Sequence, residues 1–222
     1  MKKRIIIILI VATMGLFSCK QGNKATPDNV DKKTLNSAKN VLSEPLTNDK
    51  DIYTRYKYID SKGASLIIKN SFPKSGIDYT DSNGKKYIYA VFWTRIINIT
   101  ANPLELTINF PLDSFEIPSS SGNYMRLLLH TDTMTINKKP LYDYGLTIKS
   151  FLDNNSHKST SLERTINSKS SSAFYVVALS NHGVNGTLRT GLSLKEQNVF
   201  YRINDKEIHC GKINLKNLML QK

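Results

Sequence analysis

Hydrophobic and polar residues alternate strictly along residues 104–110, which read LELTINF. Successive side chains of an extended strand point to opposite faces. The four apolar residues of this stretch therefore share one face, and Glu105, Thr107 and Asn109 share the other. This pattern predicts a β-strand with one face in a hydrophobic core and the other in solvent.

The preceding stretch, residues 86–100 (KYIYAVFWTRIINIT), is apolar at both odd and even positions. It predicts a long central strand that is covered on both faces, or one that bends between two sheets. On this interpretation Phe92 and Ile96 project to one side, Trp93 projects to the other, and all three are buried. The Asn-Pro pair at residues 102–103 is typical of a turn. We therefore expect this stretch and the alternating one to form a β-hairpin.

Further short segments with strand character follow one another across residues 51–222, separated by turn-forming clusters such as DSNG at residues 81–84. About ten short strands at this spacing, without a convincing long helix, predict an all-β fold. We expect a single antiparallel β-sandwich domain of immunoglobulin-like or related type. The serine-rich connection over residues 154–172 predicts one mobile loop. The other predicted strands are residues 52–59, 65–70, 124–130, 133–136, 145–152, 172–179, 198–203 and 207–215.

The N-terminus has the pattern of an export signal. Three basic residues at positions 2–4 precede thirteen mostly apolar residues, 5–17. A resident transmembrane helix needs about 20 apolar residues, so this stretch is too short to be one. The signal ends in LFSC at residues 16–19. This run resembles the lipobox of bacterial lipoproteins, with an aliphatic residue three positions before the cysteine and a small residue directly before it.

The resemblance implies that Cys19 receives a diacylglyceryl group and becomes the first mature residue, so that the protein is held to a membrane by its lipid. Residues 1–18 are then the signal peptide, and residues 19–50 are a lipidated N-terminus and disordered, flexible linker, because they are polar and contain no aromatic residue. Lys20 is not the aspartate that retains enterobacterial lipoproteins at the inner membrane, which implies the outer membrane. The lack of an early acidic cluster favours its periplasmic face, and the external face stays open.

The charge of the chain limits the classes of partner. The formal net charge is +13, and removal of residues 1–18, which contain three basic residues and no acidic one, lowers it to +10. The basic residues are scattered, whereas a nucleic-acid site gathers them on one face. We therefore expect no nucleic-acid partner. A lysine-rich surface keeps an exported domain soluble, or attracts anionic lipid or polysaccharide.

The sequence contains no recognisable catalytic motif, and we predict no catalytic residue, no metal and no cofactor. His209 and Cys210 are adjacent, so on a strand they point to opposite faces and do not share a metal ion. Cys210 has the parity of Ile208, which predicts a buried apolar role. If Cys19 is acylated, Cys210 has no partner for an intramolecular disulfide. The DSNG cluster lacks the flanking carboxylates of an EF-hand loop and is predicted to be a turn.

Three aromatic residues of the central stretch are candidates for a binding site. Tyr87, Tyr89 and Trp93 share one face and are candidate ligand-stacking residues, with core packing as the alternative. The leading hypothesis is a lipid-anchored envelope protein whose non-catalytic sandwich binds a protein or glycan partner. The alternative is a glycosidase-like envelope hydrolase whose pair of carboxylates is brought together only by the fold.

The lipobox resemblance predicts that Cys19→Ser abolishes lipid attachment and leaves unprocessed or soluble protein. Metabolic labelling with a fatty-acid probe measures this directly, because the acyl chains enter through the Cys19 thiol. A Cys19→Ser protein that still carries the label would contradict the assignment.

Overall fold

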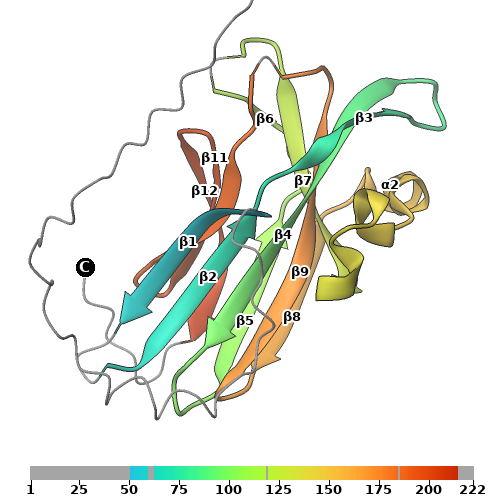
Figure 1. Cartoon of the computed structure of the whole chain (residues 1–222). Helices are drawn as coiled ribbons and strands as arrows, with labels where there is room; N and C mark the ends of the chain where they lie inside the picture. Colours follow the sequence, from blue (N-terminus) through green and yellow to red (C-terminus); the bar gives the residue numbers. More distant parts are fainter. Residues whose placement is uncertain (1–50, 60–62, 119, 185, 215–222) are drawn as a thin grey trace, which may run out of the picture. The chain divides into compact units, whose positions relative to one another are not determined.

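Two antiparallel β-sheets are stacked on each other in the computed structural model, which describes residues 51–59, 63–118, 120–184 and 186–214 (Figure 1). Sheet A has the strand order β1-β2-β4-β9-β7-β6, with β3 also paired to β4, and sheet B has the order β10-β11-β12-β5-β8. The predicted antiparallel β-sandwich is therefore confirmed. The predicted signal peptide, Cys19 and the linker lie outside the described residues.

The described part of the chain contains twelve strands, where about ten were predicted. Sheet A consists of β1 (Ile52–Ile59), β2 (Ser65–Ser71), β3 (Lys74–Thr80), β4 (Lys86–Asn98), β6 (Phe115–Glu116), β7 (Tyr124–Thr133) and β9 (Ser170–Ser180). Sheet B consists of β5 (Leu104–Phe110), β8 (Thr160–Ile166), β10 (Thr190–Lys195), β11 (Asn198–Ile203) and β12 (Lys206–Asn214). The helical elements are η2 (Ile136–Lys138), η3 (Tyr142–Gly145) and α2 (Ile148–Asn155).

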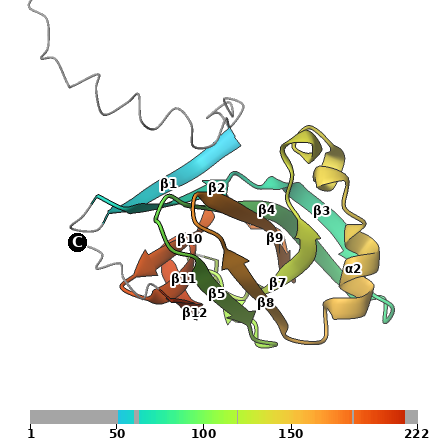
Figure 2. The same cartoon turned by 90° about the horizontal axis from the view of Figure 1, so that it is seen from below.

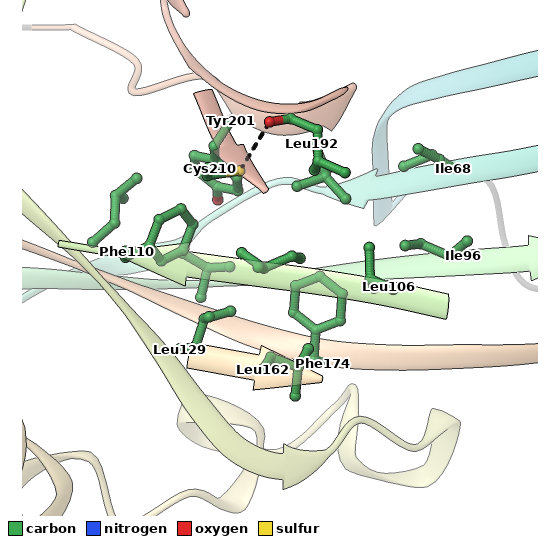
Figure 3. Close-up of a cluster of buried hydrophobic side chains, with 14 of the residues drawn as sticks. Ile68, Ile96, Leu106, Phe110, Leu129, Leu162, Phe174, Leu192, Tyr201 and Cys210 are labelled. Carbon is green, nitrogen blue, oxygen red and sulfur yellow. Dashed lines mark hydrogen bonds between the residues drawn. The ribbon is translucent and has the colours of Figure 1, made fainter. Parts of the chain in front are cut away.

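The main hydrophobic core lies between the two sheets (Figure 3). Strand β5 contributes its four apolar residues to this core and exposes Glu105, Thr107 and Asn109, as its alternation predicts. The rings of Phe110 and Tyr201 meet edge to face, with their centroids 5.4 Å apart.

A second core lies on the opposite face of sheet A. Its members include Trp93 of β4, Tyr144 of η3 and Leu152 of α2. Figure 2 shows α2 beside β3, and the Tyr79 hydroxyl of β3 donates a hydrogen bond of 2.8 Å to Asp153 in α2. Sheet A is therefore covered on both faces, which explains why residues 86–98 are apolar at both odd and even positions.

Strand β4 is long enough to pair with two shorter strands, β2 and β3, along the same edge. Its C-terminal half pairs with β2 and its N-terminal half pairs with β3, and the two partners are separated by Phe72 and Pro73. A proline has no N–H to donate to a ladder. At this break the Trp93 N–H donates instead to the Ser71 hydroxyl, at 2.9 Å. The DSNG turn that joins β3 to β4 is confirmed, with Gly84 at a φ of +77°.

A buried asparagine joins the two sheets along one side of the sandwich. The Asn70 amide of β2 donates to the Leu192 carbonyl of β10 at 3.0 Å and accepts from the Leu192 N–H at 2.9 Å. A Cβ at Gly191 would lie 2.8 Å from the Asn70 amide nitrogen, so this approach requires glycine. The Asn70 side chain thereby provides hydrogen-bond partners for backbone groups of β10, an edge strand that would otherwise leave them unpaired.

The predicted hairpin between the central stretch and residues 104–110 is wrong, because β4 belongs to sheet A and β5 to sheet B. The buried Asn98 amide stabilises the crossing instead. Its Nδ2 lies 2.8 Å from the Asn102 carbonyl and 2.9 Å from the Ile166 carbonyl, and its Oδ1 accepts from the Thr100 N–H at 2.9 Å. These bonds hold a corner rather than a tight turn.

Three other predictions about single segments are wrong. Residues 145–152 contain the start of helix α2, whose apolar residues at 148, 151 and 152 follow helical spacing. Residues 133–136 form no separate strand, because β7 ends at Thr133 and η2 begins at Ile136. The expected loop over residues 154–172 contains strand β8, which pairs with β5. Like β8, strands β3, β6 and β10 had no counterpart among the predicted ones.

Truncation of a side chain between the sheets should destabilise the protein far more than truncation on the outer face of β5. Phe92 is buried, so Phe92→Ala should lower the free energy of unfolding by about 3–5 kcal/mol. Glu105 is exposed and accepts a hydrogen bond from the Thr165 hydroxyl on the surface, so Glu105→Ala should change the free energy of unfolding by at most about 0.5 kcal/mol. Chemical denaturation, followed by Trp93 fluorescence, measures the free energy of unfolding of the two variants. Equal costs for the two variants would place Phe92 outside the core.

Candidate functional site

The three candidate stacking residues lie on the outer face of β4, the face turned towards α2. Tyr89 and Trp93 are buried and Tyr87 is half-buried. They therefore pack into the second core and form no exposed aromatic row. Trp93 nevertheless lines a cavity, and the candidate site is built around it.

This cavity, here called the aromatic–lysine pocket, has a volume of about 190 Å³. It forms where the break between β2 and β3 faces the segment that carries η2 and η3. Four parts of the chain that are separate in sequence therefore meet there. The lining residues are Asp51, Phe72, Pro73, Lys74, Trp93, Lys139 and Tyr144.

Two lysine ammonium groups of the pocket lie over aromatic rings. Lys74 Nζ is 5.0 Å from the centre of the Tyr144 ring, and Lys139 Nζ is 4.9 Å from the centre of the Trp93 ring. The negative face of an aromatic ring attracts a cation at such distances. Asp51 contributes the one carboxylate, 3.8 Å from Lys139 Nζ. Among the described lining residues the charged groups are therefore two lysines and one carboxylate, and the buried Asp143 carboxylate belongs to the adjoining wall.

The wall that carries Tyr144 has an unusual backbone. Asp143, Tyr144 and Gly145 have φ values of 47°, 58° and 67°, a left-handed conformation that is costly for residues other than glycine. Two interactions hold it in place. The Tyr89 hydroxyl donates to the buried Asp143 carboxylate at 2.6 Å, and the Tyr144 ring packs against the Tyr175 ring at 5.3 Å between centroids. The wall of the pocket is therefore fixed by the second core.

The Tyr144 hydroxyl is uncharged at neutral pH, where an ordinary tyrosine is also protonated. Burial raises the pKa of Tyr144 further, to about 12. The positive charge of the two lysines is therefore not offset by a phenolate.

The rim of the pocket exposes apolar side chains. Phe72 is 44% exposed and packs against Tyr53, with ring centroids 5.4 Å apart. The segment of η2 and η3, which supplies Lys139 and Tyr144 to the pocket, also exposes Ile136, Leu141 and Tyr142. An exposed aromatic ring beside a charged pocket is typical of a surface that binds a partner.

The carboxylate pair that a glycosidase needs is not found at the described cavities. Among the described lining residues, the aromatic–lysine pocket contains Asp51 as its one carboxylate, and a basic pocket beside Tyr53 contains Asp205. An apolar cavity between sheet A and the loop after β9 contains none. Within the described ranges, no group of three histidine, cysteine or carboxylate side chains is placed to hold a metal ion.

The structure places Cys210 in the main core, as predicted. Its thiol lies 3.5 Å from the Val199 carbonyl, and burial raises the pKa of the Cys210 thiol to about 12. His209 points away and its ring packs against Phe200. Cys210 is therefore a structural residue with a protonated thiol, and it does not act with His209.

Sequence reasoning found Trp93 and missed the residues that surround it. Lys74 and Lys139 are separated by 64 positions in the chain, and no local pattern links them. One signal was available at Pro73, because a proline cannot donate to a strand ladder and therefore indicates the end of a strand. The exposure of Phe72 beside this break could be seen only in the structure.

Comparison of the chain with models of protein families, with curated proteins and with solved structures gave no match. No helix in the described ranges is long and apolar enough to cross a membrane. The function of the protein therefore has to be inferred from the chemistry of its own pockets.

Proposed function

We propose that this chain is a lipid-anchored protein of the bacterial cell envelope, whose β-sandwich binds an acidic glycan in the aromatic–lysine pocket. The observation that carries the proposal is the pair of lysines, Lys74 and Lys139, which lie over aromatic rings and line one cavity. This arrangement combines positive charge with apolar surface, and an acidic sugar presents the matching groups.

The chemistry of each group supports this ligand class. A carboxylate or sulfate on the sugar accepts charge-assisted hydrogen bonds from the lysines, which are about twice as strong as neutral ones. The apolar face of a sugar ring packs on the exposed Phe72 ring. The Asp51 carboxylate accepts hydrogen bonds from sugar hydroxyl groups, so it contributes specificity rather than net charge.

The proposed anchor supports the same location. A diacylglyceryl group on Cys19 gives stable membrane attachment, because two acyl chains hold where one does not. A linker of the length of residues 19–50 has an end-to-end distance of roughly 30 Å. The domain would then search the space beside the outer membrane, where envelope polysaccharides lie. The proposal does not include catalysis, since the pocket has only one carboxylate.

Binding can be measured through Trp93, the only tryptophan of the chain, because its ring lines the pocket. We expect oligogalacturonate to change its fluorescence and a neutral cello-oligosaccharide to bind much more weakly. Lys74→Gln should weaken binding of oligogalacturonate about tenfold or more, the value of one charge-assisted bond. Phe72→Ala should weaken it several-fold by removing the stacking surface.

Matched controls separate the pocket from general surface charge. Lys86→Gln removes an equal charge from an exposed position on β4, and Leu112→Ala removes an exposed apolar side chain outside the pocket. Neither should change binding. If acidic and neutral oligosaccharides bind equally, or if Lys74→Gln and Lys86→Gln have the same effect, the proposed glycan site is wrong.

A further inference from the structure

A second cavity lies between sheet A and the loop after β9, at the end of the sandwich where β4 begins and β9 ends. It exists because small residues face each other on the inner side of sheet A. Ala90 pairs with Ala178 across β4 and β9, and Gly76 of β3 lies beside Ile88. Ala90 is only half-buried although Phe92, the next inward residue of β4, is fully covered. The packing of the main core is therefore incomplete at this point.

The lining of this cavity is mainly apolar. The strands supply Ile88, Met125 and the two alanines, and the loop after β9 supplies Val184 and Leu188, which pack against the main core. The polar contributions come from Ser180, His182 and Thr187, and the Ser180 hydroxyl already donates to the Tyr124 carbonyl at 3.3 Å. Such a lining suits a hydrocarbon group with a polar end.

The volume of the cavity sets the size of its ligand. It measures about 300 Å³. A dry cavity of about 150 Å³ accommodates one benzene molecule, so this one has room for roughly twelve carbon atoms. A medium-length acyl chain meets this requirement.

A basic pocket adjoins the apolar cavity, and Thr187 lines both. The basic pocket has a volume of about 410 Å³ and contains Arg189 and Arg202, with Asp205 as its one carboxylate. Arg202 forms an ion pair with Glu207 at 2.9 Å. Arg189 lies over the Tyr53 ring, 5.8 Å from its centre, and forms no ion pair with any described residue.

We infer that these two adjoining spaces form one binding site for an anionic amphiphile. Its acyl chain fills the apolar cavity, and its carboxylate or phosphate head binds Arg189. The juxtaposition carries this inference, because an apolar cavity alone fits any hydrocarbon and an arginine alone fits any anion. This site is distinct from the aromatic–lysine pocket and does not depend on the proposed glycan.

Isothermal titration calorimetry of the mature protein with alkanoates, below their micelle concentrations, tests whether the cavity binds an acyl chain. Affinity should rise about three- to fourfold with each added methylene, and the increase should stop at roughly twelve carbon atoms. An affinity that does not depend on chain length would overturn the inference. This series uses the unaltered protein and does not depend on whether a variant folds.

A comparison of ligands with different head groups tests whether the site recognises a negative charge. Dodecanoate and dodecyl phosphate should both bind, and dodecanol and dodecyltrimethylammonium should bind at least tenfold more weakly. Inorganic phosphate serves as the probe for a free anion. If phosphate binds as tightly as dodecyl phosphate, the site holds an anion alone and the inference is wrong. If dodecanol binds as tightly as dodecanoate, the site holds an apolar ligand alone, which overturns it equally.

Two variants assign the binding to the site. Arg189→Gln should weaken binding of dodecanoate about tenfold or more, whereas Arg164→Gln, the same change on β8 at the opposite edge of sheet B, should not. Ala90→Leu adds three carbon atoms to the cavity and should shorten the optimal chain of the alkanoate series. Equal effects of the two arginine variants, or an unchanged optimum in folded Ala90→Leu protein, would overturn the assignment. The Lys74→Gln variant should bind dodecanoate normally, so this inference and the glycan proposal fail independently.

Discussion

The burial of sheet A on both faces is the constraint on which the rest of the structure depends. Phe92 and Trp93 are consecutive residues of β4, and they enter two different cores. Phe174 and Tyr175 do the same on β9. A strand of this kind is stable only when both faces are removed from water, since each large apolar side chain left exposed forfeits about 1.5–3 kcal/mol. Sheet B covers one face, and the segment of η2, η3 and α2 covers the other.

Both proposed binding sites lie where this two-sided cover is incomplete. Pro73, in the break between β2 and β3, lines both the aromatic–lysine pocket and the apolar cavity between sheet A and the loop after β9. On the outer face, the strained wall at Tyr144 stays in place because Tyr89 and Tyr175 of the second core hold it. On the inner face, Ala90 is too small to fill the space beside it. The stability of the sheet and the shape of the pockets therefore have the same physical origin.

The sequence was most informative where one strand carries its own pattern. Strand β5 alternates because one face meets water. Strand β4 is apolar at both odd and even positions because both of its faces are covered, so both environments could be predicted locally. The pairing partner of each strand could not be predicted, because it depends on contacts between distant segments. The corner after β4, for example, is held by a hydrogen bond from the Asn98 amide to the Ile166 carbonyl. The same holds for the sites. Trp93 was identifiable as an aromatic residue on a strand, whereas Lys139 and Arg189 acquire their roles only through contacts between distant segments.

Hydroxyl-radical footprinting of the native protein tests the two-sided burial most directly, because it reports the solvent exposure of Phe92 and Trp93 separately. Each is 2% exposed, whereas Tyr142 on the covering segment is 72% exposed. The structure predicts that Phe92 and Trp93 are both protected until the protein unfolds, while Tyr142 is oxidised rapidly in the native state. Oxidation of either Phe92 or Trp93 at the rate of Tyr142 would show that one face of β4 is open to water, and would contradict the account.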